Sequence, residues 1–142
     1  MELKLELEEL RAFLAIEFPQ MIGEYDLEAI GPLWARVSLT PEERHLRPGG
    51  TVSGPTIFGL ADCAVYFGLL AMIGKEALAV TTSASIDFMR KPVAGTKLVA
   101  DVTFHKVGRV LAVGDVAVRN DGVEALVART TFTYSIPPKR DA

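Results

Sequence analysis

The chain has 142 residues, 49% of them hydrophobic, which is enough to bury the core of one globular domain and little for two. Fifteen basic and eighteen acidic residues give a net charge of -3, and no basic stripe interleaved with aromatic residues is present, which argues against a nucleic-acid partner. The single cysteine, Cys63, excludes an intrachain disulfide, and the first residues lack a secretory pattern, so we expect a cytoplasmic protein.

The N-terminal segment is predicted to form an amphipathic helix over residues 1–20, ending near Pro19. Its leucines recur at the spacing of one helix face and stand opposite charged residues. The leucines with this spacing are Leu3, Leu7, Leu10 and Leu14. This extra helix has two open roles, since it could cover either a sheet edge or the mouth of a pocket.

From Glu24 the pattern changes to the period of two that is typical of strands. Alternation is clearest over residues 33–39, and Thr40-Pro41 closes the strand. Gly31-Pro32 interrupts the segment. Two interpretations remain open there: one bent or bulged strand, or two strands that meet.

Residues 55–73 form a predicted helix that is apolar on every side except for one acid, Asp62. Nineteen apolar residues are about the length that crosses a bilayer. However, translocon scales penalise a central charge by roughly 2.5 to 3.5 kcal/mol, and Gly59 and Gly68 also interrupt the segment. A helix that is apolar all round is equally typical of the buried centre of a globular fold, which is the interpretation we favour.

Four long β-rich runs follow this helix, separated by turn signals. Gly108 and Asp121-Gly122 lie at hairpin distances, which predicts antiparallel neighbours in a meander. Without helices alternating with these strands, a doubly wound sheet is excluded. The predicted runs are residues 78–89, 97–107, 110–119 and 124–136.

These elements predict an α+β fold in which a curved antiparallel sheet wraps around one long central helix. The sheet covers one side of the apolar helix, so the remaining apolar surface needs a second body. We therefore expect a homodimer, and a homotetramer formed as a dimer of dimers stays open.

Three motifs in order resemble one family. The first is the run Arg47-Pro48-Gly49-Gly50-Thr51-Val52-Ser53-Gly54-Pro55-Thr56-Ile57-Phe58-Gly59-Leu60-Ala61-Asp62. The second is Ser85-Ile86-Asp87-Phe88-Met89-Arg90-Lys91-Pro92, and the third is Gly108-Arg109 followed by Leu111-Ala112-Val113. Together they resemble the hotdog-fold acyl-CoA thioesterases of the phenylacetate-pathway (PaaI-like) type. The resemblance covers residues 24–136 and implies a hotdog core there, within a single domain 1–142.

The resemblance also implies roles for individual residues. Asp62 takes the position of the catalytic acid, and Gly54 that of the glycine whose backbone N–H polarises the thioester carbonyl. Thr81 falls where the family has a hydroxyl that helps to hold the attacking water. This chain has Arg47 where the family has Asn, and Ser53 where it has His.

Thioester chemistry needs a base or nucleophile and donors aimed at the oxygen that becomes negative. The free N–H groups and dipole of a helix N-terminus at Gly54 can supply such donors. The alternative is that Ser53 merely caps the helix. Eight helical residues separate Gly54 from Asp62 by about 12 Å, so one chain cannot bring both to one carbonyl. We therefore predict active sites shared between two protomers.

Asp62 could instead be a structural acid that bonds Thr or Ser side chains of the sheet. If it is catalytic, its use as base or as nucleophile stays open. Coenzyme A phosphates suit Arg side chains, and aromatic residues could line an acyl pocket. The candidates for substrate binding are Arg47, Arg90 and Arg109, with Phe58 and Tyr66 for the acyl or aryl group.

Two other functions remain open. A dehydratase acting on 3-hydroxyacyl thioesters would pair a histidine with the helix acid, and His45 is the loop histidine available. A binding protein would hold acyl-CoA without turnover. His45, His105 and Cys63 lack metal-ligand spacing, so we expect no metal and no cofactor beyond the coenzyme A of the substrate.

Overall fold

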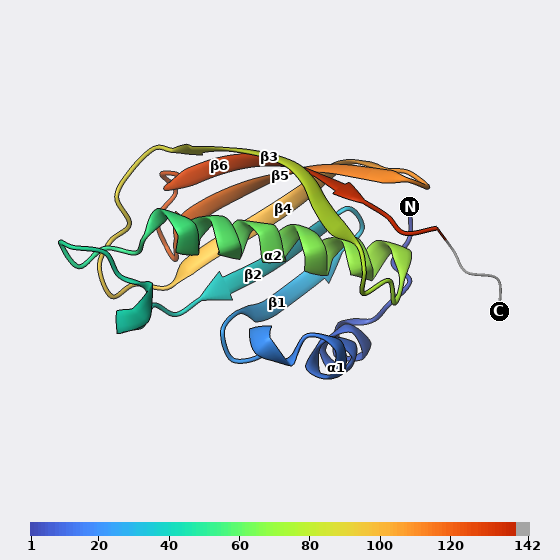
Figure 1. Ribbon diagram of the computed structural model, residues 1–142. Coiled ribbons are helices and arrows are strands. Elements are labelled where there is room, and N and C mark those ends of the chain that lie inside the picture. The colour runs from blue at the N-terminus through green and yellow to red at the C-terminus, as the bar shows by residue number, and fades with distance from the viewer. Residues whose placement is uncertain (139–142) are drawn as a thin grey trace.

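The computed structural model describes residues 1–138, so the last four residues of the predicted domain lie outside the described part. Six antiparallel strands form one curved sheet in the order β1-β2-β4-β5-β6-β3, and the long helix α2 lies along its concave face (Figure 1). The predicted α+β architecture is confirmed. The helices are α1 (Leu7–Glu17), α2 (Gly54–Ile73) and the 3-10 turns η1 (Pro19–Met21) and η2 (Glu43–His45). The strands are β1 (Asp26–Gly31), β2 (Trp34–Leu39), β3 (Val80–Phe88), β4 (Leu98–Val107), β5 (Leu111–Asn120) and β6 (Ala128–Ser135).

The interruption at Gly31-Pro32 is a hairpin turn between two strands, β1 and β2, which pair antiparallel from Gly31 opposite Trp34. Leu33 completes the turn with φ of 58°, a conformation that few residues other than glycine adopt. Two hydrogen bonds hold this backbone: the Leu33 N–H donates to Met72 Sδ, and the Leu33 carbonyl accepts from Phe104 N. Of the two interpretations of this segment, two strands is correct.

Strands β4, β5 and β6 form the predicted meander. Strand β3, which precedes them in the chain, pairs with β6 and forms one edge of the sheet. The run predicted for residues 124–136 was too long, because β6 begins at Ala128, where its ladder to β5 starts opposite Val118. In the described chain β3 has no strand on its other side. Its free edge carries exposed apolar side chains at Val80 and Phe88.

Helix α2 is the core of the fold, with Leu60, Ala61 and Ala64 among its fully buried residues. It is long and apolar enough to span a bilayer, yet 72% of its most apolar 18-residue window is buried inside the fold. The helix is apolar all round because the sheet covers one face and α1 packs on another (Figure 1).

Helix α1 is shorter than the predicted helix of residues 1–20. It begins at Leu7, where Glu6 and Glu9 form a reciprocal capping box, and it ends at Glu17 before Pro19. The residues before it are not helical, and the N–H groups of Lys4 and Leu5 donate to the carbonyl of Ala71 in α2. The N-terminal segment therefore covers part of the helix surface that we had assigned to a second protomer.

Candidate active site

The acid of the central helix is fixed through one of its two oxygens. Asp62 Oδ1 accepts hydrogen bonds from Thr81 Oγ1 and from the Tyr134 hydroxyl, each at 2.6 Å. The Tyr134 hydroxyl also lies 3.2 Å from the carbonyl oxygen of Asp62. Asp62 Oδ2 has no partner among residues 1–138. The structure thus joins Asp62 to Thr81, which is the kind of contact that the structural alternative for Asp62 expects, and it leaves one carboxylate oxygen available.

Asp62 lines a cavity of about 610 Å³ between α2, the N-terminal segment and the start of β3. On α2 the cavity follows a single helical stripe, since its lining residues there recur at i, i+3, i+4 and i+7. These are Gly59, Asp62, Cys63 and Tyr66. The opposite wall comes from residues that the sequence analysis did not connect with the site: Glu17, Phe18, Gln20, Met21 and Tyr25. The N-terminal segment thus helps to form the mouth of this pocket. Helix α1 also contacts the edge strand β1, where the Arg11 guanidinium donates to the Leu27 carbonyl at 2.7 Å.

The two aromatic residues proposed for an acyl pocket behave differently. Tyr66 lines the cavity, and its hydroxyl donates to the carbonyl of Ala77 at 2.7 Å. Phe58 instead packs its ring against Phe132 of β6, with centroids 5.3 Å apart, and does not line this cavity. Both residues lie four positions from Asp62, but only Tyr66 lines the cavity.

Tyr134 is a site residue that the sequence analysis missed. Burial, and then the charge of Asp62, raise the pKa of Tyr134, so its hydroxyl stays protonated and donates to the carboxylate. The strand alternation does indicate the side to which the Tyr134 side chain points, because alternate residues of β6 are buried and face α2. Those residues are Ala128, Thr130, Phe132 and Tyr134. The alternation does not indicate which of these four residues contacts Asp62.

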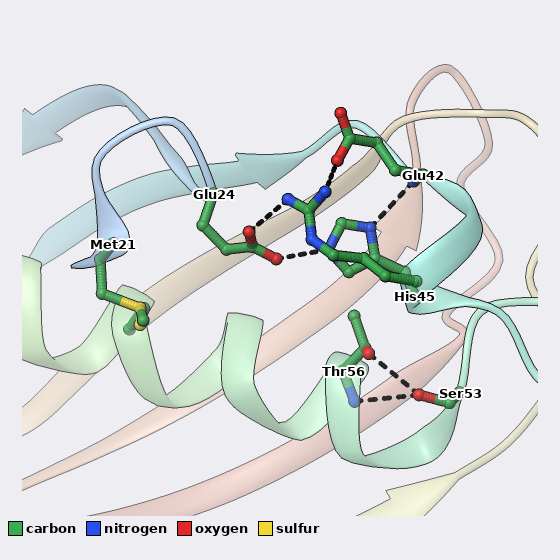
Figure 2. Close-up of polar contacts among 8 residues, drawn as sticks. Met21, Glu24, Glu42, His45, Ser53 and Thr56 are labelled. Atoms are coloured by element: carbon green, nitrogen blue, oxygen red, sulfur yellow. Dashed lines mark hydrogen bonds and ion pairs between the residues drawn. The ribbon is translucent and has the colours of Figure 1, made fainter.

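At the start of α2 one backbone donor remains free. Pro55 has no N–H, Thr56 N donates to Ser53 Oγ at 3.4 Å, and Ile57 N donates to the Ser53 carbonyl at 3.1 Å. Only the Gly54 N–H lacks a partner in the first turn, within the part of the chain that is described. Ser53 is therefore the helix cap, as the alternative held, and Figure 2 shows its contacts to Thr56.

Gly54 lines a second cavity, of about 420 Å³. Its rim carries three cationic side chains, Arg47, Arg90 and Lys91, and Phe88 covers Gly54, with a ring carbon 3.3 Å from where a Cβ would stand. Arg47 and Arg90 are thus brought together beside Gly54, as their predicted role in binding requires. Arg109 does not lie beside Gly54, because it lines a different cavity at the other end of α2, together with Ile73.

Gly54 and Asp62 belong to different cavities of the protomer. At 1.5 Å per residue, the eight residues between them amount to about 12 Å along the helix axis. A reacting carbonyl group requires contacts of about 3 to 3.5 Å, so these two groups of one chain do not meet on the same carbonyl.

His45 belongs to a separate polar network that fastens the loop before α2 (Figure 2). Its Nε2 bonds Glu24, its Nδ1 accepts from the Glu42 N–H at 2.9 Å, and its carbonyl accepts from Ser53 N at 2.8 Å. Hydrogen bonds from His45 and then Arg44 lower the pKa of Glu24. Both ring nitrogens of this buried histidine are occupied, so it is not the partner of Asp62 that a dehydratase would need.

Cys63 lines the Asp62 cavity but is poorly reactive. Burial, followed by the charge of Asp62, raises the pKa of its thiol to about 12. At pH 8 only about 10⁻⁴ of such a thiol is ionised, and the thiolate is the nucleophile. We expect native protein to react with 5,5'-dithiobis(2-nitrobenzoate) at least about 10³-fold more slowly than protein in denaturant, which should release one equivalent. Fast labelling of the native protein would contradict this.

Tyr25 and Gly59 fit together across the cavity. A Cβ on Gly59 would come within 2.7 Å of the Tyr25 hydroxyl oxygen, but 3.9 Å from the nearest ring carbon. Gly59→Ala should therefore lower the free energy of unfolding by roughly 1 to 3 kcal/mol through overpacking. In a Tyr25→Phe background the same change should raise it by about 1 kcal/mol, because alanine favours helix. Denaturant unfolding at one protein concentration measures both, and equal effects in the two backgrounds would contradict the contact.

No group of three or more His, Cys, Asp or Glu side chains that could hold a metal ion occurs in the described chain. The thioesterase superfamily model matches residues 49–127, which span α2 and the strands β3, β4 and β5. A Deinococcus radiodurans protein named "Putative esterase" is 37% identical over 105 residues, covering 74% of this chain and 68% of its own length.

Solved structures give the same result. A Silicibacter sp. TM1040 protein named "putative thioesterase" is 53% identical, with 97% and 96% of the two chains covered and a TM-score of 0.90. The phenylacetic acid degradation protein PaaI of Thermus thermophilus is 28% identical, with 84% and 99% covered and a TM-score of 0.73. A Streptococcus mutans protein bound to acetyl-CoA is 27% identical, with 82% and 91% covered and a TM-score of 0.71.

The chain therefore belongs to the thioesterase superfamily. It has the hotdog fold of PaaI-like proteins, and it is an enzyme of the thioester hydrolase class.

Proposed function

We propose that this enzyme hydrolyses acyl-CoA thioesters to a carboxylic acid and coenzyme A, with Asp62 as the reacting acid. The observation that carries this proposal is the asymmetry of the carboxylate. Two hydroxyl groups hold Oδ1, while Oδ2 stays without a partner in residues 1–138 at the wall of a cavity large enough for an acyl group. Oδ2 is therefore free to accept a proton or to attack a carbonyl carbon, which an acid with both oxygens bonded would not be.

Asp62 can act in two ways that this geometry supports equally. As a general base it takes a proton from water that attacks the carbonyl carbon, and as a nucleophile it attacks that carbon itself. In both cases the C–S bond breaks and coenzyme A leaves as the thiol. The proposed reaction needs no metal and no cofactor, since coenzyme A enters as part of the substrate.

The substrate class follows from the cavity at the start of α2. Arg47, Arg90 and Lys91 give it the positive charge that suits phosphate groups, and the related Streptococcus mutans protein has acetyl-CoA bound. The free Gly54 N–H in the same cavity suits the oxygen that becomes negative during attack. We therefore assign the coenzyme A end of the substrate to this cavity and the acyl end to the cavity of Asp62.

The separation of these two cavities supports a site shared between protomers. In a twofold homodimer the same two surfaces meet twice, so Asp62 of one protomer can face the start of α2 of the other. The free edge of β3, with exposed Val80 and Phe88, supports pairing of β3 with a second copy. The N-terminal segment covers part of the apolar surface of α2, so this surface alone does not require a dimer. The dimer proposal depends on the free edge of β3 and on the placement of Gly54 and Asp62 in different cavities.

A thiol-release assay tests the proposed function. Acyl-CoA substrates of increasing chain length should release coenzyme A, and the matched pantetheine thioesters should show a KM at least tenfold higher, because they lack the terminal phosphates. Equal KM values for both series would contradict coenzyme A as the substrate class. Release of water without thiol would identify the dehydratase, and tight binding without either product would identify a carrier.

A further inference from the structure

The wall of the Asp62 cavity carries four hydroxyl groups, and three of them have assigned partners. Thr81 and Tyr134 donate to Asp62 Oδ1, and Tyr66 donates to the carbonyl of Ala77. The fourth belongs to Tyr25, and it has no hydrogen-bond partner among the residues that the structure describes. A half-buried hydroxyl without a protein partner is free to donate to water or to a ligand in the cavity.

The position of the Tyr25 hydroxyl is fixed relative to Asp62. It lies over Gly59, 2.7 Å from where a Cβ would stand, and Gly59 precedes Asp62 by three residues on the same helix face. Residues at this spacing have Cβ positions about 5 to 6 Å apart. The Tyr25 hydroxyl and the Asp62 carboxylate therefore line the same part of one cavity, which has room for a water molecule.

Gly59 lowers the stability of helix α2, but it leaves space for the Tyr25 hydroxyl. A glycine inside a helix costs about 1 kcal/mol relative to alanine, yet alanine at position 59 would displace the hydroxyl. Burial, followed by the charges of Cys63, Glu24 and Asp62, raises the pKa of Tyr25 to about 12. The hydroxyl therefore stays protonated at neutral pH and can only lose its proton to solvent in strong base.

We infer that Tyr25 is a further catalytic residue, whose hydroxyl donates a hydrogen bond to the hydrolytic water that Asp62 Oδ2 activates. This inference rests on the proposed function with Asp62 as general base. The water accepts from Tyr25 through one lone pair and donates one O–H to Oδ2. Its other lone pair forms the bond to the carbonyl carbon, its proton passes to Asp62, the C–S bond breaks, and the leaving thiolate takes that proton.

Thr81 and Tyr134 cannot replace Tyr25 in this role. Each has one hydroxyl proton, and each donates it to Oδ1, so toward a water molecule they can only accept. A water that donates to Oδ2 needs a donor on its other side to fix its direction of attack. Tyr25 supplies this donor from the N-terminal wall of the cavity, opposite β3 and β6.

The test compares Tyr25→Phe with the wild type and with Tyr66→Phe over acyl-CoA substrates of several chain lengths. Tyr25→Phe should lower kcat by roughly 10- to 100-fold at every chain length, with KM changed less than threefold. Its unfolding curve should match the wild type, because the lost hydroxyl has no protein partner among the described residues. Tyr66→Phe loses a hydrogen bond to Ala77 and lies in the acyl cavity, so its effect should fall on unfolding and on KM, a pattern that differs from the kcat effect of Tyr25→Phe.

Three outcomes would contradict either the role of Tyr25 or the proposed function. A kcat of Tyr25→Phe within twofold of the wild type, together with an inactive Asp62→Asn, would overturn the role of Tyr25 and leave the proposed function standing. An effect on KM alone, confined to particular acyl groups, would also overturn it and make Tyr25 a contact of the acyl group. An active Asp62→Asn would instead overturn the proposed function itself.

Discussion

Asp62→Asn is expected to lower kcat for thioester hydrolysis by roughly 10²- to 10⁴-fold, the range that a general base or nucleophile contributes. Asparagine keeps the shape of the side chain and an oxygen acceptor for Thr81 and Tyr134, so the fold should survive. It is neutral, however, and neither takes a proton nor attacks a carbonyl. Coenzyme A release in the steady state measures the effect.

Asp121→Asn is the matched control, because it makes the same chemical change in an exposed turn away from both cavities. Its kcat should stay within twofold of the wild type. If Asp62→Asn retained more than a tenth of the wild-type kcat, Asp62 would be a structural acid that only joins α2 to Thr81 and Tyr134.

Gly54→Pro should lower kcat by roughly 10²- to 10³-fold, the loss that follows removal of one oxyanion donor. Proline deletes the free N–H and is favoured at the first position of a helix. The preceding residue also tolerates it, since Ser53 has φ of -71° and ψ of 154°, in the extended region that proline requires before it. The helix should therefore start as it does in the wild type.

Gly54→Ala separates the loss of the N–H from the added bulk. Alanine brings the same Cβ toward the Phe88 ring, which stands 3.3 Å from that position, but keeps the N–H. The account predicts that Gly54→Ala keeps most of the activity. Equal kcat values for the proline and alanine variants would show that bulk beside Phe88, and not the donor, matters at this position.

Prediction from the sequence worked best where one pattern had one interpretation. The long apolar run around Asp62 predicted α2, and the turn residues after it predicted the meander. The start of α1 was missed because Leu3, Leu5 and Leu7 fit strand alternation as well as the helical face. Only the capping box at Glu6 and the bonds from residues 4 and 5 to Ala71 decide where the helix begins.

The candidate site was predicted in part for a similar reason. Resemblance to a family indicated Asp62, Gly54 and Thr81, and the structure joins Asp62 to Thr81. It could not indicate Tyr25 or Tyr134, because each meets the helix through contacts between residues far apart in the sequence. Local spacing contains no information on such contacts.

Phe58 shows the limit of helical periodicity. It lies as close to Asp62 along the helix as Tyr66 does, yet its ring packs on Phe132. The curvature of the sheet around α2 decides which side of the acid is covered, and that curvature is a property of all six strands.

The central claim is that the acid of one protomer works with the Gly54 amide of another. It is tested by co-expressing Asp62→Asn and Gly54→Pro chains with different tags, isolating the mixed population and measuring coenzyme A release. Each variant alone should be inactive. Each mixed dimer has one of its two sites intact, so the isolated mixed dimers should show about half of the wild-type activity per dimer. Verified mixed dimers that stay as inactive as the parent variants would contradict a shared site.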